Sequence, residues 1–196
     1  VQNNIEYMVS VRSTAETVSA LDAFLFWGRV QCDAYKKIYT NQTEKLHVTS
    51  NPRIDLWEKE KYHALCTDTV TDIQNTYGDY FIIPTSFGSY NHFMGKEGAM
   101  DVYKAGHFVT EDSVAFFEEY EEYAKNIYYG FIDIIEPLSK SFPNKSIIVR
   151  PHPSENRKPW DELAKKFDNV YVVFSGGVTP WLLGAEAVLH CGSTTA

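Results

Sequence analysis

Four short apolar runs, separated by segments of helical character, constrain the fold of this chain more than any other feature. The runs are residues 80–84, 147–149, 170–174 and 187–190. They lack the apolar–polar alternation of a strand with one wet face, so each predicts a strand buried on both faces. Strands that alternate with helices are typical of a parallel sheet covered on both sides. The sequence therefore predicts an α/β fold built on a doubly wound, Rossmann-like parallel sheet.

The segments between these runs predict three helices and one loop. Residues 110–138 place apolar side chains at helical spacing after a Thr-Glu-Asp start, which favours a long helix. Residues 159–167 begin with proline, and a Thr-Pro pair at residue 179 predicts a third, short helix. Residues 85–109 contain four glycines and predict a long loop. A loop of that length inside a compact domain is usually functional.

The amino-terminal third predicts its own, smaller set of elements. Residues 23–28 are an apolar run closed by glycine, residues 31–39 have helical character, and residues 46–49 form another short apolar run. A strand, a helix and a second strand are therefore expected here. Residues 54–78 are strongly charged and indicate a connection between two parts of the chain.

These patterns divide the chain into two Rossmann-like parts. We expect residues 1–60 to be the end of an incomplete amino-terminal domain, residues 61–78 to be a linker, and residues 79–196 to be a carboxy-terminal domain truncated at residue 196. The chain does not begin with methionine and ends where a helix is expected to start. We therefore interpret it as a fragment of a two-domain protein.

Composition excludes several classes of function. The net charge of −8 argues against a nucleic-acid-binding protein, which normally presents a basic face. The three cysteines have no CxxC spacing, so the sequence predicts no zinc site and is consistent with a reducing, cytoplasmic location. No cofactor is expected. No apolar stretch approaches the 18 residues that a membrane-spanning helix needs.

Cationic and polar residues follow the apolar run 147–149. Arg150, His152 and Ser154 alternate with Pro151 and Pro153. Prolines stiffen the loop and remove backbone donors, which leaves the polar chemistry to the side chains. Ligands of parallel sheets bind outside the carboxyl ends of the strands. We expect these side chains to bind an anion such as phosphate, although a rigid turn with a surface histidine would have the same sequence.

A second polar run follows the last apolar segment. Ser193, Thr194 and Thr195 come at an expected helix start, where free N–H groups attract anions. The same residues also suit a simple helix cap, and the two roles are compatible. Neither GxGxxG nor GxxxxGK[ST] is present, so the fingerprints of dinucleotide and P-loop sites are missing.

The glycine-rich segment after residues 80–84 is a candidate cleft loop. Ser86, Phe87 and Gly88 follow the strand directly, and Glu97 lies further along between two glycines. An acid in such a loop is a candidate general base, but a solvated surface acid is the commoner case. The sequence therefore identifies no catalytic residue.

The order of motifs resembles that of bacterial surface-carbohydrate (surface polysaccharide) biosynthesis proteins. Residues 48–55 resemble their TGNPR-D segment, with Ser50 where the family has glycine. Phe26-Trp27-Gly28, residues 150–155, Pro180-Trp181 and residues 190–196 extend the likeness over most of the chain from Phe24 onward. The family is similar to GT-B glycosyltransferases, in which two Rossmann-like domains face each other across a cleft.

The resemblance implies a function and partners. Residues 79–196 would bind a nucleotide-sugar donor, with CMP as one candidate nucleotide, and the acceptor would be a glycan or a lipid-linked glycan. His152 and Pro153 would contact the donor phosphate together with Ser193 and Thr194. No metal is implied, and the protein would act in the cytoplasm, with peripheral association at the inner face of the membrane. This chain alone would be inactive.

Two other functional readings stay open on the same fold. The first is a different enzyme, either a glycerophosphotransferase of the CDP-glycerol type or a UDP-sugar epimerase, which also uses histidine and hydroxyl side chains at strand ends. The second is a non-catalytic nucleotide-sugar-binding module. Product analysis separates the enzymes, and donor binding without transfer indicates the module.

Overall fold

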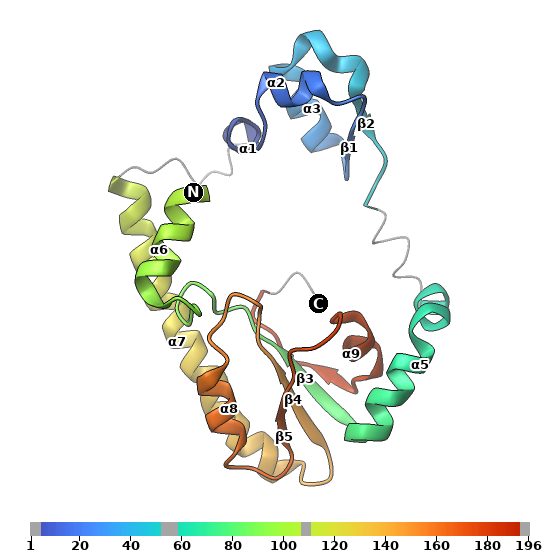
Figure 1. Cartoon of the computed structure of the whole chain (residues 1–196), viewed down its shortest axis with the longest axis vertical. Coiled ribbons are helices and arrows are strands. Elements are labelled where there is room, and N and C mark those ends of the chain that lie inside the picture. The colour runs from blue at the N-terminus through green and yellow to red at the C-terminus, as the bar shows by residue number, and fades with distance from the viewer. Residues whose placement is uncertain (1–4, 52–58, 107–110, 193–196) are drawn as a thin grey trace. The chain divides into compact units, whose positions relative to one another are not determined.

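The computed structural model describes residues 5–51, 59–106 and 111–192, which form two compact units (Figure 1). Contacts divide the chain between Leu65 and Cys66. Each unit has its own parallel sheet, so the structure is α/β throughout. Among the described residues, no helix has the length and apolar character needed to cross a lipid bilayer.

The first unit is a small βαβ arrangement. Its two parallel strands pair Phe24 with Leu46, and the connecting helix packs on them through Cys32 and Tyr35. The Tyr35 hydroxyl lies 2.5 Å from the Ser13 hydroxyl, so this buried phenol is not left unpaired. The elements are α1 (Ile5–Arg12), α2 (Ala15–Ala20), β1 (Phe24–Phe26), α3 (Arg29–Ile38), η1 (Thr40–Lys45) and β2 (Leu46–Val48).

The second unit contains a four-stranded, wholly parallel sheet in the order β5-β4-β3-β6. The chain forms β3, adds β4 and β5 on one side, and returns to place β6 on the other side of β3. This order matches the first four strands, 3-2-1-4, of the Rossmann order 3-2-1-4-5-6. The elements are α5 (Lys59–Tyr77), β3 (Tyr80–Pro84), α6 (Gly95–Gly106), α7 (Glu111–Ser141), β4 (Ser146–Arg150), α8 (Lys158–Ala164), β5 (Val170–Val172), α9 (Thr179–Gly184) and β6 (Ala187–Val188).

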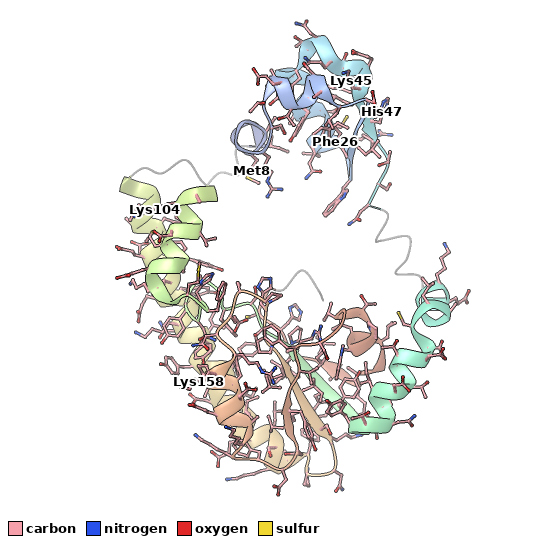
Figure 2. All side chains as sticks on the ribbon, in the orientation of Figure 1. Met8, Phe26, Lys45, His47, Lys104 and Lys158 are labelled. Carbon is pink, nitrogen blue, oxygen red and sulfur yellow. The ribbon has the colours of Figure 1, made fainter. Side chains whose placement is uncertain are left out.

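Helices cover both faces of this sheet. Alternate residues of β3 point to opposite faces, so Ile83 packs with α7 and α8 while Ile82 packs with α5 and α9. Figure 1 shows α7 and α8 on one side of the strands and α5 and α9 on the other. Side chains fill both layers (Figure 2). The doubly wound parallel sheet predicted from the apolar runs is therefore confirmed.

One expectation about a connection differs from the structure. Residues 95–106 of the expected long loop form α6. Gly95 begins this helix with a φ of +77°, and Gly98 is needed because a Cβ there would lie 2.3 Å from the Met94 Cβ. Residues 61–78, expected as a connecting helix or linker, lie almost wholly within helix α5. Ile73 and Tyr77 from that helix pack in the core of the second unit, so its carboxyl half belongs to the domain.

Candidate functional site

The strand order of the second unit fixes where a crevice can form. β4 and β6 flank β3, and the connections that lead to them pass over opposite faces of the sheet. The described residues after β6, Leu189 and Cys191, pack in the same layer as Phe87 after β3. In open parallel sheets, ligands bind outside the carboxyl ends of the strands. The residues that follow β3, β4 and β6 are thus the first place to look for chemistry.

His152 follows β4 and has an exposed imidazole with a defined partner. The backbone N–H of Ser154 donates to Nδ1 over 3.2 Å, and the Ser154 hydroxyl lies 2.7 Å from the same nitrogen. A ring nitrogen that accepts from a backbone N–H carries no proton, so the neutral ring holds its proton on Nε2. This assignment rests on the hydrogen-bond network. His152 therefore presents an Nε2–H donor at the carboxyl edge.

The loops after β3 and β4 touch at Gly88 and Ser154. A Cβ on Gly88 would lie 2.3 Å from the Ser154 hydroxyl oxygen, closer than real contacts allow. Glycine at residue 88 therefore leaves room for the hydroxyl that contacts His152. Ser86 is exposed beside this contact. The sequence predicted all four residues as site residues, and the structure brings Gly88, His152 and Ser154 together.

Phe87 has a different position from the one expected of a cleft residue. Its side chain is buried and packs against Tyr128 and Trp160 beneath the sheet edge. Only its backbone N–H takes part in the polar network of the loops, where it donates to Glu155 over 3.0 Å. Phe87 is a core residue because its ring completes the packing between β3, α7 and α8.

Arg150 is held by carbonyl groups of the neighbouring loop. Its Nη1 donates to the Ser175 oxygen over 2.9 Å, and its Nη2 donates to the Gly176 oxygen. The guanidinium carbon also lies 5.8 Å from the centre of the Trp181 ring. Burial lowers the pKa of Arg150 from its ordinary value. These contacts tie the guanidinium to the loop after β5, whereas the sequence suggested an anion ligand.

The other predicted residues lie apart from this contact or outside the described residues. Pro153 is exposed in the loop with His152. Glu97 is an exposed residue of the first turn of α6. Ser193, Thr194 and Thr195 lie outside the described residues. Cys191, two residues before Ser193, packs partly against the core beneath the sheet edge. Burial, and to a smaller extent the charge of Glu155, raises the pKa of its thiol.

Sequence reasoning missed Glu155. The motif that contains it was recognised, but the acid itself was given no role. The structure buries its side chain, which is only 2% exposed, among donors from three segments of the chain. An acid between a strand and a helix usually stays in solvent, and local sequence gives no signal of burial. The only pointer was its place at the end of a strand-end motif.

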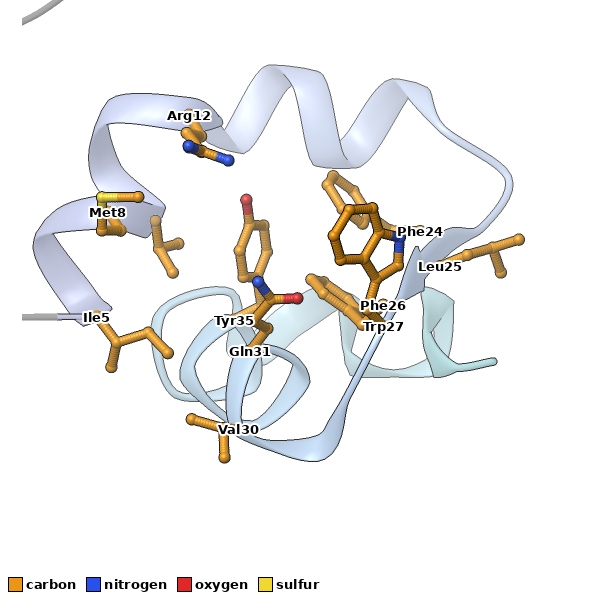
Figure 3. A pocket seen from close by; sticks show the side chains of 11 residues that line it. Ile5, Met8, Arg12, Phe24, Leu25, Phe26, Trp27, Val30, Gln31 and Tyr35 are labelled. Atoms are coloured by element: carbon orange, nitrogen blue, oxygen red, sulfur yellow. The ribbon is translucent and has the colours of Figure 1, made fainter. Parts of the chain in front are cut away.

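The first unit contains a separate apolar hollow of about 680 Å³ (Figure 3). Its polar side-chain groups include the Arg12 guanidinium, the Gln31 amide and the Trp27 indole N–H. The Tyr35 hydroxyl contacts Ser13. This volume suits a small-molecule ligand with a largely apolar surface. The lining residues are Ile5, Met8, Val9, Arg12, Phe24, Leu25, Phe26, Trp27, Val30, Gln31 and Tyr35.

Neither metal geometry nor similarity to known proteins adds to this picture. Among the residues that the structure describes, no three His, Cys, Asp or Glu side chains are grouped to hold a metal ion. Comparisons with known protein families, curated proteins and solved structures find no significant match.

Proposed function

We propose that this chain is part of a GT-B-like glycosyltransferase of surface polysaccharide biosynthesis, and that its second unit binds the nucleotide-sugar donor. The observation that carries the proposal is the exposed Nε2–H of His152 at the carboxyl edge of a Rossmann-ordered sheet. A donor held at such an edge suits the phosphate of a nucleotide sugar. Gly88 supports the proposal because it lets the two flanking loops approach closely.

The first unit gives independent support for the family resemblance. Ser50 has a φ of 67°, which lies in the left-handed region that favours glycine. The family pattern has glycine at this position. A serine at positive φ is expected if this chain keeps the backbone path of the family and has serine in place of glycine.

The proposed reaction displaces a nucleotide phosphate from the anomeric carbon. The acceptor hydroxyl oxygen bonds to that carbon, the carbon–oxygen bond to the phosphate breaks, and the electron pair leaves with the phosphate. The hydroxyl proton passes to a general base that the described residues do not identify. Within this scheme His152 donates to the phosphate as negative charge develops on it. Arg150 keeps the neighbouring loop in place through its carbonyl contacts.

The hollow of the first unit fits the acceptor side of the proposal. Its aromatic and aliphatic lining suits the lipid portion of a lipid-linked glycan better than a free glycan, and Arg12 supplies a positive charge for a phosphate headgroup. Peripheral association of the protein with a membrane follows from such an acceptor.

A thermal-shift screen of the chain with CMP, UDP, GDP and CDP tests donor binding. A nucleotide that binds only the folded state at 100 times its Kd raises stability by about 2.7 kcal/mol. We expect one nucleotide to raise the melting temperature of the wild type and to have less effect on His152→Ala. No shift with any of the four contradicts the proposal. In the full-length protein, a glycosidic product, a phosphodiester or an epimerised sugar distinguishes the enzyme classes.

A further inference from the structure

Glu155 is the most completely satisfied buried acid at the edge of the second sheet. Its Oε1 accepts from the Thr85 hydroxyl over 2.6 Å, from the Phe87 N–H over 3.0 Å and from the His152 N–H over 3.1 Å. Its Oε2 accepts from the Trp160 indole N–H over 3.2 Å. All four donors are neutral groups, so this carboxylate is held by hydrogen bonds and not by a paired cation.

These four donors come from three separate segments of the chain. Thr85 and Phe87 follow β3, His152 follows β4, and Trp160 lies on α8. The same carboxylate therefore joins the two loops that bracket the contact between Gly88 and Ser154. Backbone pairing reinforces the junction, because the Phe93 N–H donates to the Ser154 oxygen over 2.9 Å and the Asn156 N–H donates to the Asn91 oxygen over 2.7 Å.

This arrangement gives Glu155 a geometric role. With its oxygens occupied by donors and its side chain closed to solvent, Glu155 is unsuited to take a proton from a substrate. Its bond to the His152 backbone instead fixes the turn that brings the Ser154 N–H onto the imidazole Nδ1. The turn determines which ring nitrogen carries the proton.

We propose that Glu155 is a positioning residue that sets the tautomer and direction of the His152 imidazole. The effect of this role on ligand binding rests on the proposed function, whereas the effect on the imidazole does not. If Glu155 were merely a stabilising core residue, its loss would lower stability and leave the ring of His152 as it is. The test must therefore read the ring itself.

The test compares Glu155→Gln with Glu121→Gln in the whole chain. Glutamine keeps the size of the side chain but places an NH₂ group among four donors. Glu121 is a matched control, since it is also largely buried, pairs with Lys96 over 2.7 Å and lies on α7 instead of in the loop that carries His152. Nitrogen-15 NMR of the histidine rings reports the tautomer of His152, and calorimetry with CMP reports binding.

We expect Glu155→Gln to replace the single Nε2–H form of His152 by a mixture of tautomers. We also expect it to weaken CMP binding roughly tenfold or more, which corresponds to the loss of one charge-assisted hydrogen bond to phosphate. Glu121→Gln should change neither. Thr85→Val, which removes one donor and keeps the side-chain volume, should shift the ring in the same direction by less. It supplies the test if Glu155→Gln does not fold.

The outcomes separate the two proposals. The positioning role is overturned if folded Glu155→Gln leaves the His152 ring signals unchanged, even if CMP binds. If Glu155→Gln does not fold, unchanged ring signals in folded Thr85→Val overturn it. A wild type that binds no CMP, UDP, GDP or CDP contradicts the proposed function. Even if the wild type binds none of these nucleotides, a tautomer change in Glu155→Gln upholds the role of Glu155 in orienting the imidazole.

Discussion

Both units contain a βαβ arrangement, but the strands are buried more completely in the second unit than in the first. In the second unit all five residues of β3 are buried, because helices pack on both faces of the sheet. In the first unit β1 buries only Phe26 fully, and Leu25 is 59% exposed. A parallel sheet is stable only when both faces are covered. The second unit therefore provides the rigid frame, and the polar strand-end residues that need such a frame lie on it.

The largest expected difference between the units is the loss of unfolding free energy when a strand residue is truncated. Ile82→Ala removes a fully buried side chain from β3, and such truncations cost about 2–5 kcal/mol of unfolding free energy. Leu25→Ala on β1 should cost less than about 1 kcal/mol, because the leucine is mostly exposed already. Urea denaturation followed by circular dichroism measures both. Equal losses would show that the two strands are not covered differently.

A pair of exposed histidines tests the proposal that the second unit binds a nucleotide. His152→Ala should weaken CMP binding roughly 10- to 150-fold, the equivalent of one hydrogen bond to a charged group. His47→Ala removes an exposed histidine from β2 in the first unit (Figure 2) and should leave the affinity unchanged. Calorimetry with CMP, run beside a melt of each apo variant, separates loss of binding from loss of folding. The opposite ranking would place the site in the first unit.

Substituting alanine for two glycines in the second unit should change stability in opposite directions. Gly88→Ala forces its new methyl group against the Ser154 hydroxyl, so we expect a loss of about 1–3 kcal/mol and weaker CMP binding. Gly130→Ala, in open space on α7, should gain about 0.5–1 kcal/mol because glycine is unfavourable inside a helix. Chemical denaturation of both variants checks the signs. A neutral Gly88→Ala would mean that the loops are not in close contact.

Ser50 offers a smaller test within the first unit. Ser50→Gly should stabilise this unit by about 1 kcal/mol, since it removes the steric penalty of a side chain at positive φ. Ser50→Ala keeps a Cβ and should give no gain. Thermal melts of the two variants compare them directly. A destabilised Ser50→Gly would indicate that the serine side chain, and not the backbone path, determines this turn.

The prediction with the smallest effect on stability at neutral pH concerns two buried tyrosines. Burial raises the pKa of Tyr80 and Tyr128 to about 12 in the second unit, whereas the unfolded chain has the ordinary value near 10. The unfolded state therefore loses these protons first. The contribution of the two tyrosines to stability should be constant below pH 10 and fall as the pH rises towards 12. Tyr80→Phe should flatten part of this fall. A fall that begins below pH 9 would point to other groups.

The sequence predicted the strands better than the connections. Runs such as Tyr80–Pro84 are fully apolar because both faces of the strand are buried, and that requirement is visible locally. Helix α6 was predicted as a loop because its glycines disfavour a helix, yet Gly98 is required by the Met94 side chain. Such packing depends on three-dimensional neighbours that a residue pattern does not record.

The candidate site was predictable to a similar extent. His152, Ser154 and Gly88 could be proposed because polar and small residues at strand ends have a known meaning in parallel sheets. The partners of Arg150 and the burial of Glu155 could not, because they depend on loops that follow other strands. Contacts between segments about seventy residues apart, such as Thr85 and Glu155, leave no periodic trace in the sequence.

Backbone NMR of the chain titrated with CMP tests the central claim most directly. The account predicts that the amide shifts change at the carboxyl edge of the second sheet, in residues 85–88, 152–155 and 190–192, while those around the hollow of the first unit stay constant. The result that would contradict it is the reverse pattern, with changes in residues 24–31 and an unperturbed loop around His152.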